Sequence, residues 1–421
     1  NYSSVRKFTV SGWFKRTEIT VQSLVWFNVS TATSVQLEFD SADKLSFILQ
    51  DNVGNGVESY SKTSAVFRDT SAYYHVILAV DTTQGTAANR TKIYVNGVNQ
   101  TLVQGNGSYD TFPAQNYDCP LQTRHYLLGY DGGNNGFRGY AAEYYFLDGI
   151  TASPTDFGEF DEDSGIWKPI EYTGGFGNEG YYLDFEDASA LGKDVSSNNQ
   201  GNFSHYGGSA ADQSTDTPTN NFCTLNPLMT NTGNFLAITE GGTRATNTVT
   251  SYKTAASTIG LSSGKWYWEV KLTNMNTITA MGVTMPYYWD TDFSFGGCVY
   301  YGQPAQRYNN SSASFYGATY ATGDIIGFAL DMDATTPTMT CYKNGVSQGN
   351  LFSGLSINGA GAAFLPPKED FYFAKLVAYN TNVFDCNFGG YTAFTISSAA
   401  SDDNGYGTFE YAPPSGYYAI C

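Results

Sequence analysis

Two stretches of the chain repeat the same alternation of apolar and polar residues. Residues 75–81 read HVILAVD and are followed, after a polar loop, by KIYVNGV at 92–98. Residues 325–333 read IIGFALDMD and are followed by MTCYKNGV at 339–346. Each partner segment contains Asn-Gly, which favours a type I′ turn because both residues tolerate positive φ. Each copy therefore predicts three consecutive antiparallel strands.

The same alternation predicts which side chains face a hydrophobic core, because successive residues of a strand point to opposite faces of a sheet. The core-facing residues of the first stretch and its partner are Val76, Leu78, Val80, Ile93 and Val95. Those of the second stretch and its partner are Ile326, Phe328, Leu330, Met332, Met339 and Cys341. Two such cores, far apart in the chain, predict two β-sandwich domains in tandem.

Further alternating segments supply the other strands. They are residues 5–14, 21–28, 35–39, 44–49 and 139–149 in the first half and residues 261–272, 279–285 and 371–390 in the second. Helix-period patterns are almost absent, whereas 45 Gly, 33 Tyr and 28 Phe are typical of short strands joined by many turns. The predicted fold class is all-β, with two tandem β-sandwich (jelly-roll) domains joined by a polar linker.

Composition places the domain boundaries. A chain of 421 residues is too long for one compact core. We predict a first domain at 1–187, a linker at 188–222 whose Ser, Asn, Gly and Asp content leaves no apolar face, and a second domain at 223–395. The remaining C-terminal extension, 396–421, has by this division no sandwich left to join, so we expect sequence to continue beyond Cys421.

The motifs of the first domain follow a recognisable order. FTVSGWF, YYHVILAVD, KIYVNGV, YLLGY and FRGYAAEYYFLDGI succeed one another over residues 1–150. This order resembles a laminin G-like, concanavalin A-type jelly roll, in which a W-H-H-V strand precedes a Y-V-N-G hairpin. Tyr73 or Tyr74 stands here at the tryptophan position, and Ala141-Ala142-Glu143 stands in the closing strand, where the family has G-x-I-D-E-V.

The second domain resembles a SPRY domain over residues 235–390, through GKWYWEV, IIGFALD and CYKNGV. The resemblance implies that loops of this domain form a ligand-binding face. Aromatic side chains in those loops could stack on sugar rings or anchor an interface, or they could pack against their own domain. The candidate ligand-binding residues are Tyr287, Tyr288, Trp289, Tyr300, Tyr301, Tyr316 and Tyr320.

Four segments outside these motifs carry a further resemblance. DEDSGIWKPIEYTG, LGKDVSSNNQGNF, TDTPTNNFCTLNPL and PPSGYYAIC are similar to stretches of bacteriophage virion proteins. In those proteins a jelly roll, such a linker and a SPRY module occur in this order on fibres and appendages. The resemblance implies a virion structural protein, assembled in the host cytoplasm and displayed on the virion surface, with other virion proteins as partners and a homo-oligomeric state.

The net charge and the cysteine spacing each exclude some kinds of binding partner or site. A net charge of −18 argues against nucleic acid, because phosphate binding needs clustered Lys and Arg, and no apolar run predicts membrane insertion. The six cysteines show no metal-binding or disulfide-framework spacing. Cys341 and Cys386 lie in apolar strands and are expected to be buried, reduced thiols.

Signals for metals and catalysis are weak. Asp81, which closes its strand, and Asp131, in YDGGNNG, are the positions at which this kind of jelly roll could bind calcium, although Asp is also an ordinary turn residue. Calcium is the one cofactor considered. Glu159, Asp161 and Asp163 alternate as in glucanases of this fold, but Ser164 stands where the last glutamate is required. His75 is expected at a sheet surface.

The sequence therefore predicts a non-enzymatic virion protein of a phage fibre or appendage. It would bind a host-surface glycan or protein, or hold the receptor-binding tip away from the particle. One alternative is a secreted or cell-surface adhesin of an extracellular matrix, with an extracellular location. The other is a carbohydrate-active enzyme on a concanavalin A-like fold.

Overall fold

A computed structural model describes the chain except for residues 31–32, 52–57, 123, 131–134, 205–208, 230–232, 289–296, 310–311 and 354–370, and except for the side chains of residues 29, 30, 287 and 353. The described part is almost entirely strand. Its helical elements are single 3-10 turns, namely η1 (Ala87–Asn89), η3 (Pro154–Asp156), η4 (Ala210–Asp212) and η5 (Pro286–Tyr288). None of the helical turns described is long or apolar enough to cross a membrane. The all-β prediction is confirmed.

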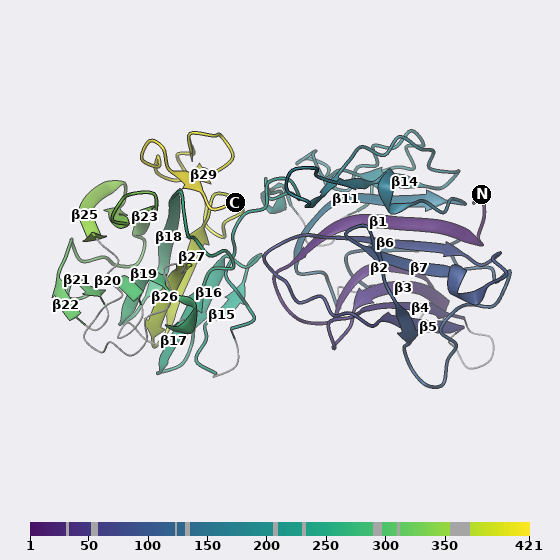
Figure 1. Cartoon of the computed structure of the whole chain (residues 1–421), viewed down its shortest axis with the longest axis horizontal. Helices are drawn as coiled ribbons and strands as arrows, with labels where there is room; N and C mark the ends of the chain where they lie inside the picture. Colours follow the sequence, from purple (N-terminus) through teal and green to yellow (C-terminus); the bar gives the residue numbers. More distant parts are fainter. Residues whose placement is uncertain are drawn as a thin grey trace. The chain divides into compact units, whose positions relative to one another are not determined.

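The chain forms two compact units (Figure 1). The first contains residues 1–213 and 217–219, and the second contains residues 214–216 and 220–421. In each unit two antiparallel sheets lie face to face and enclose a hydrophobic core to which both sheets contribute side chains. The prediction of two β-sandwiches in tandem is therefore confirmed.

The two sheets of the first unit are named here after a central strand. The β1 sheet has the order β14 (Tyr181–Leu183), β11 (Gly139–Asp148), β1 (Lys7–Arg16), β6 (Tyr74–Asp81), β7 (Thr91–Val95) and β8 (Val98–Asn99). The β3 sheet has the order β10 (Arg124–Leu127), β2 (Gln22–Ser30), β3 (Thr33–Phe39), β4 (Leu45–Gln50), β5 (Ser59–Thr63) and β9 (Leu102–Gln104). Phe146 of the first sheet meets Phe27 of the second edge to face, with ring centroids 5.3 Å apart.

The first predicted meander is β6, β7 and β8. Asn96 and Gly97 have φ values of 48° and 78°, as a type I′ turn requires. All five predicted core residues of this meander are buried between the sheets. A Cβ atom on Gly97 would lie 2.7 Å from the ring of Trp167, so the turn fits beneath that ring only as glycine.

Residues 150–180, called the first cover, lie over the outer face of the β1 sheet and lead into its edge strand β14. The cover contains the short hairpin of β12 (Gly158–Phe160) and β13 (Trp167–Pro169). His75 is buried on this face, stacked on Trp13 at 4.5 Å, and its Nδ1 accepts a hydrogen bond from Trp167 Nε1 at 2.9 Å. His75 was expected at a sheet surface, and it does lie on an outer face, but the cover removes it from water.

The predicted linker, 188–222, differs from what the structure shows, because its first part is folded onto the first unit. Asp194 accepts hydrogen bonds from the backbone N–H groups of Tyr182 and Gln200, and the Asn198 side chain donates to the carbonyls of Gly177 and Gly180. Polar side chains here bind backbone groups instead of water, which composition alone does not reveal. The units divide within residues 213–220.

The sheets of the second unit are larger. The β18 sheet has the order β15 (Ala237–Thr239), β16 (Arg244–Asn247), β27 (Asn382–Asn387), β18 (Lys265–Met275), β23 (Ile325–Asp331), β24 (Thr338–Lys343) and β25 (Val346–Ser353), with β30 (Tyr418–Ala419) parallel to the start of β18. The β19 sheet has the order β17 (Tyr252–Ala256), β26 (Phe373–Tyr379), β19 (Thr279–Thr284), β20 (Gly297–Tyr301), β21 (Gln306–Asn309) and β22 (Ser312–Phe315). Trp268 stacks on Phe328 at 5.2 Å in the core between them.

The second predicted meander is β23, β24 and β25, and its turn repeats the first one. Asn344 and Gly345 have φ values of 49° and 77°. The predicted core residues are buried, except that Met332 is only partly buried at the margin of the core. A Cβ atom on Gly345 would lie 2.6 Å from the ring of Tyr411, which again leaves room only for glycine.

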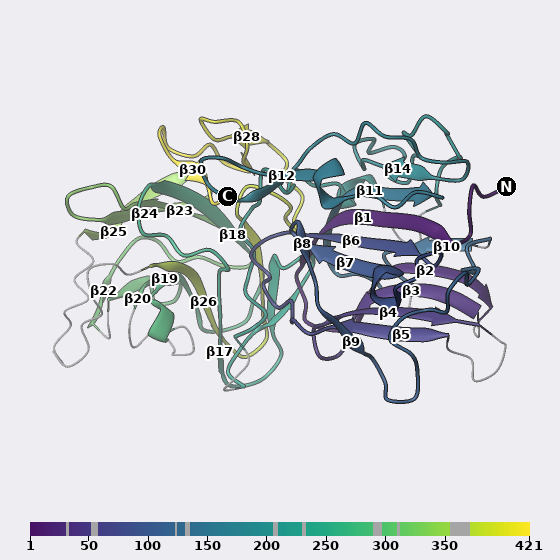
Figure 2. The same cartoon turned by 45° about the vertical axis from the view of Figure 1, so that its right-hand side comes forward.

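Residues 388–421, called the second cover, correct the prediction that the C-terminal extension has no sandwich to join. They include β28 (Ala400–Ser401), β29 (Thr408–Phe409) and β30 (Figure 2). Ile420 enters the core, and Phe409 and Ala419 bury Tyr267 on the outer face of the β18 sheet. The backbone N–H groups of Glu410 and Tyr411 both donate to the carboxylate of Glu269, at 2.9 Å each.

Candidate functional site

The outer face of the β3 sheet carries rings and hydrogen-bonding groups in one row across its strands. The pairing register places directly opposite one another, from β10 to β5, Tyr126, Trp26, Gln36, Ile48 and Tyr60. Because neighbouring strands lie about 4.8 Å apart, the row extends over about 19 Å. Strand alternation explains the arrangement, since the flanking residues of each strand, such as Val35 and Leu37, point into the core.

The aromatic end of the row is built around Trp26. Its ring meets Tyr130 edge on, with centroids 3.8 Å apart, and Tyr126 lies 6.4 Å away on the neighbouring strand. All three rings are half-buried, so part of each reaches the surface. Trp26 Nε1 has no hydrogen-bond partner in the described structure. A flat ring of this kind can stack on the apolar face of a sugar, whereas the buried N–H of Trp26 faces away from solvent.

Amide and hydroxyl groups fill the middle of the face. Gln36 Nε2 donates to Gln50 Oε1 at 3.0 Å and to Ser34 Oγ at 2.8 Å, and Ser34 Oγ donates to Gln50 Oε1 at 3.0 Å. The network fixes the orientation of the amides, so that they present a defined set of donors and acceptors.

Three charged side chains of the face, Glu38, Asp40 and Lys62, are engaged with one another or with tyrosine, and Arg124 of β10 shares the face. The Tyr130 hydroxyl donates a hydrogen bond to Glu38, and burial raises the pKa of this carboxyl above its usual value. Lys62 Nζ lies 3.1 Å from Asp40 and 5.0 Å from the centre of the Tyr60 ring. The face thus offers rings and neutral polar groups more than net charge.

The alternating pair Glu38 and Asp40 is the feature of this face closest to a catalytic one, because glycosidases use two carboxyls of opposite pKa shift. Burial would raise the pKa of Asp40, but hydrogen bonds from the backbone of Lys44, from Lys62 and from the backbone of Ala42 lower it on balance. Asp40 Oδ1 accepts from two backbone N–H groups, and Oδ2 from Ser46 and Lys62. These contacts make Asp40 the cap of the turn between β3 and β4.

Three of the aromatic residues predicted to contact a ligand are core residues instead. Tyr300, Tyr316 and Tyr320 are 0 %, 8 % and 1 % exposed and pack against one another at centroid distances of 5.0 and 5.1 Å. Their hydroxyls donate to the backbone carbonyls of Ala318, Gly349 and Thr279, respectively. The sequence placed them in loops because β20 to β22 are short and alternate weakly.

The other predicted residues of this set have different fates. Tyr288 is partly buried against the core, whereas Tyr301 lies on the outer face of the β19 sheet. The side chain of Tyr287 and all of Trp289 lie outside the described residues. A ligand contact at those two positions stays a prediction.

The two predicted calcium positions also differ. Asp81 Oδ1 accepts hydrogen bonds from the Thr83 N–H at 3.0 Å and the Thr83 hydroxyl at 2.5 Å, and Gln84 and Lys7 occupy Oδ2. These partners fit a turn-capping role. Asp131 lies outside the described residues. Within the described ranges, no three His, Cys, Asp or Glu side chains gather as metal ligands would.

The acidic run of the first cover forms the turn between β12 and β13. Asp161 accepts hydrogen bonds from Ser164 and Lys168, which hold its pKa well below the usual value. Glu159 is exposed and lies 3.4 Å from Lys168. A glycosidase acid needs burial and a raised pKa, so the contacts of Asp161 and Glu159 are those of a solvated turn.

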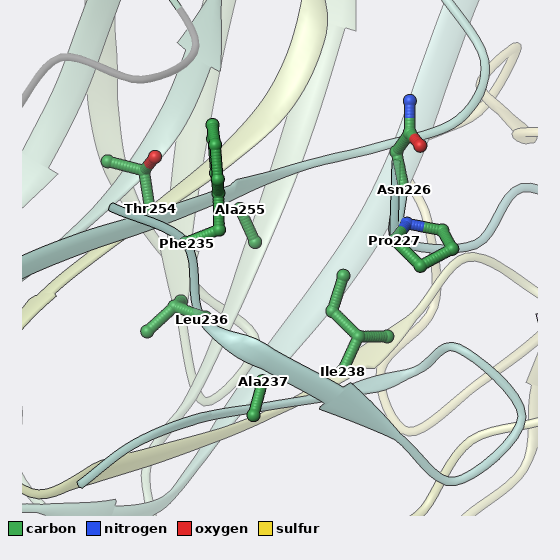
Figure 3. Close-up of a pocket in the computed structure, with 8 residues that line it drawn as sticks. All are labelled: Asn226, Pro227, Phe235, Leu236, Ala237, Ile238, Thr254 and Ala255. Carbon is green, nitrogen blue, oxygen red and sulfur yellow. The ribbon is translucent and has the colours of Figure 1, made fainter. Parts of the chain in front are cut away.

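The second unit contains a small pocket between the segment before β15 and strand β17 (Figure 3). Its volume is about 180 Å³, and Pro227, Phe235, Leu236 and Ile238 contribute to its wall. The Asn226 amide points away from the other labelled side chains (Figure 3). Ligand pockets usually measure about 300 to 1,000 Å³ and contain converging polar groups. The pocket fits no more than a small apolar group.

Two family models match parts of the chain. Residues 2–148 match the family model of the concanavalin A-like lectin/glucanases superfamily, and residues 265–367 match the model of the SPRY domain. The chain therefore contains a concanavalin A-like domain followed by a SPRY domain, as the sequence motifs predicted.

One solved structure to which the chain is similar is the crystal structure of the SPRY domain of human HERC1. It is 19 % identical, and the alignment covers 35 % of this chain and 89 % of that chain, with a TM-score of 0.29.

Among the residues of the β3-sheet face, neither Trp26 nor Tyr60 was predicted as a site residue. Alternation marks both as outward-facing, and this was the available signal. Their meeting in one row depends on the register between strands, which the sequence of each strand does not state.

Proposed function

We propose that the protein is a non-enzymatic binding protein that recognises carbohydrate through the outer face of the β3 sheet. The row from Tyr126 through Trp26 and Gln36 to Tyr60 carries the proposal, because rings at both ends flank amides in the middle. This combination suits an extended saccharide, whose rings stack and whose hydroxyls exchange hydrogen bonds. The match to a superfamily of lectins and glucanases supports a binding role.

The charge of the face favours a neutral saccharide. Asp40 and Lys62 form an ion pair, and the protein as a whole carries a net charge of −18. An acidic polysaccharide would be repelled by this field and would find few unengaged cations on the face. Binding without cleavage is proposed because four donors hold the oxygens of Asp40 in a turn.

Replacing Trp26 or Tyr60 with alanine tests the proposal. We expect each variant to bind neutral polysaccharide at least about tenfold more weakly, which corresponds to the loss of about 1.4 kcal/mol of ring stacking. The measurement is affinity electrophoresis or glycan-array titration of the full chain. Phe160→Ala is the matched control, since Phe160 is an exposed aromatic residue of the same unit on the first cover.

Unchanged affinity in both variants would remove the β3-sheet face from the function. Release of reducing ends from the bound polysaccharide, abolished by Glu38→Gln, would contradict the non-enzymatic part of the proposal and favour a carbohydrate-active enzyme.

The finer proposal is that the protein belongs to a phage fibre or appendage on the virion surface. It would attach to a host-surface glycan and assemble with other virion proteins as a homo-oligomer. Its support is the resemblance of the interdomain phrases to those of virion proteins, such as LGKDVSSNNQGNF. Immunogold labelling of purified particles tests this assignment. Labelling confined to the envelope or matrix of uninfected cells would favour the adhesin instead.

A further inference from the structure

The outer face of the β19 sheet repeats the chemistry of the β3-sheet face on a smaller scale. Over β20, β21 and β22 the register places Tyr301, Gln306 and Phe315 in one row. The adjacent row contains Val299, Tyr308 and Ala313. Residues paired directly in an antiparallel sheet share a face, so both rows lie on the side opposite the core.

The exposure of these side chains is unusual for a domain surface. Phe315 is 85 % exposed although it is a large apolar residue on a strand. Tyr301 and Tyr308 are partly buried and meet edge to face with centroids 5.7 Å apart, over a floor of buried Val299 and Ala280. The Tyr308 hydroxyl donates to Gln306 Oε1 at 3.3 Å, which orients the amide between the two rings of its row.

The two rows differ in charge from the chain as a whole. The two rows on β20 to β22 contain no Asp, Glu, Lys or Arg, in a chain that has 39 acidic and 21 basic residues. An uncharged face has no complementarity for a phosphate, an acidic glycan or a basic peptide. What it offers are flat rings about 10 Å apart across two strand spacings, with an amide between them.

The first unit has a related order, in which Trp26 and Tyr60 lie on either side of Gln36 and Ile48. We propose that Tyr301, Gln306, Tyr308 and Phe315 form a second saccharide-binding face, for one or two rings of a neutral sugar. It is a separate site from the β3-sheet face, so each stands or falls by its own variants. Two weak sites in one chain raise the apparent affinity for a repeating polysaccharide that engages both at once.

The test uses the full chain with neutral oligosaccharides and an insoluble neutral polysaccharide as probes. In the Trp26→Ala background, which weakens the first site, residual binding is expected to fall at least tenfold when Phe315→Ala or Tyr301→Ala is added. Tyr406→Ala is the matched control, because Tyr406 is an exposed aromatic residue of the same unit on the second cover. Circular dichroism establishes that each variant is folded.

Three results would overturn this proposal. The first is residual binding in Trp26→Ala that does not change when Phe315→Ala is added. Complete loss of binding in Trp26→Ala alone is the second, since no second site would then be at work. The third comes from sedimentation: if Phe315→Ala converts a dimer into a monomer and leaves sugar binding intact, the face joins copies of the chain instead. A loss confined to Phe315→Ala, with Trp26→Ala neutral, would support this face and contradict the β3-sheet proposal.

Discussion

The two units cover one sheet face each, and they do so with different chemistry. In the first unit the cover rests on rings: the neutral imidazole of His75 lies between the indoles of Trp13 and Trp167. In the second unit the cover rests on a carboxylate: Glu269 accepts hydrogen bonds from two backbone N–H groups of the second cover. In both units, the apolar–polar alternation of the strand predicts that this side chain faces solvent. Instead, a segment later in the chain binds to it.

The covers also share a contact that depends on the twin hairpins. Trp167 lies over Gly97, and Tyr411 lies over Gly345. A type I′ turn requires glycine for its φ angle, and the missing Cβ also admits a ring against the backbone. The comparison teaches that the turn residue does two things in each unit. It closes the hairpin, and it makes room for a ring of the cover.

Of the changes that test this difference between the units, replacing Trp167 with alanine should lower stability the most. Trp167 is 8 % exposed, and its loss leaves a cavity above Gly97 and removes the donor to His75. We expect the free energy of unfolding of the first unit to fall by about 3 to 5 kcal/mol. Calorimetry should show a lower transition temperature for the first unit alone. Trp167→Phe, which keeps most of the ring contact, is the control and should cost less.

A change of less than about 1 kcal/mol in Trp167→Ala would mean that the first cover is held by other contacts. Equal destabilisation of both transitions would contradict the assignment of the covers to separate units.

Glu269→Ala probes the second cover. The carboxylate is fully buried and also accepts from Tyr267 and Asn387, so its removal leaves several buried donors without an acceptor. A loss of about 3 kcal/mol in the second unit is expected. Chemical unfolding followed by tryptophan fluorescence measures it. Glu240→Ala, which removes an exposed ion pair with Arg244, is the control and should change stability by less than about 1 kcal/mol.

If Glu269→Ala matched its control, backbone capture by Glu269 would not be what attaches the second cover. The apolar contacts of Phe409 and Ala419 would then suffice.

Acidification should lower the stability of the first unit more than that of the second, with a smaller effect per group than the substitutions above. Burial lowers the pKa of His75 to about 3 and that of His125 to about 4, from an ordinary value near 6.5. Between these pKa values, the two histidines are protonated in the unfolded chain but neutral in the folded first unit. Stability from these two groups is complete above about pH 6.5 and falls as the pH decreases, by about 2 kcal/mol for each histidine at pH 4.5.

The second unit contains no histidine in its sequence, and burial raises the pKa of its Glu269, so acid does not act against that group. Calorimetry at pH 7 and pH 4.5 should therefore show the first transition moving further than the second. A larger shift in the second transition would reverse the comparison.

Much of the fold could be predicted from the sequence, because its signals are local. Asn96-Gly97 and Asn344-Gly345 specify their turns, and alternation specifies that Leu78 and Phe328 point inward. Alternation does not show whether the side chains on the outer face of a sheet are covered by another segment of the chain. Tyr267 and Glu269 follow the polar half of the period and are nevertheless buried.

The candidate site was harder to predict, because it depends on pairing between strands distant in sequence. Trp26 and Tyr60 come together only through the register of β2, β3, β4 and β5. Phe157 and Trp167 escaped prediction for a related reason: each is an isolated apolar residue in a polar, Gly-rich segment without periodicity.

The first cover has a practical consequence for recombinant expression. The family match of the first unit stops at residue 148, the end of β11, before any residue of the cover. A fragment that ended at residue 148 would lack the first cover and would expose the hydrophobic side chains of Trp13, Ile77 and Leu147 to solvent. Such a fragment should aggregate or be degraded by proteases. A fragment that extends to residue 213 retains the first cover and is therefore the better choice for crystallisation.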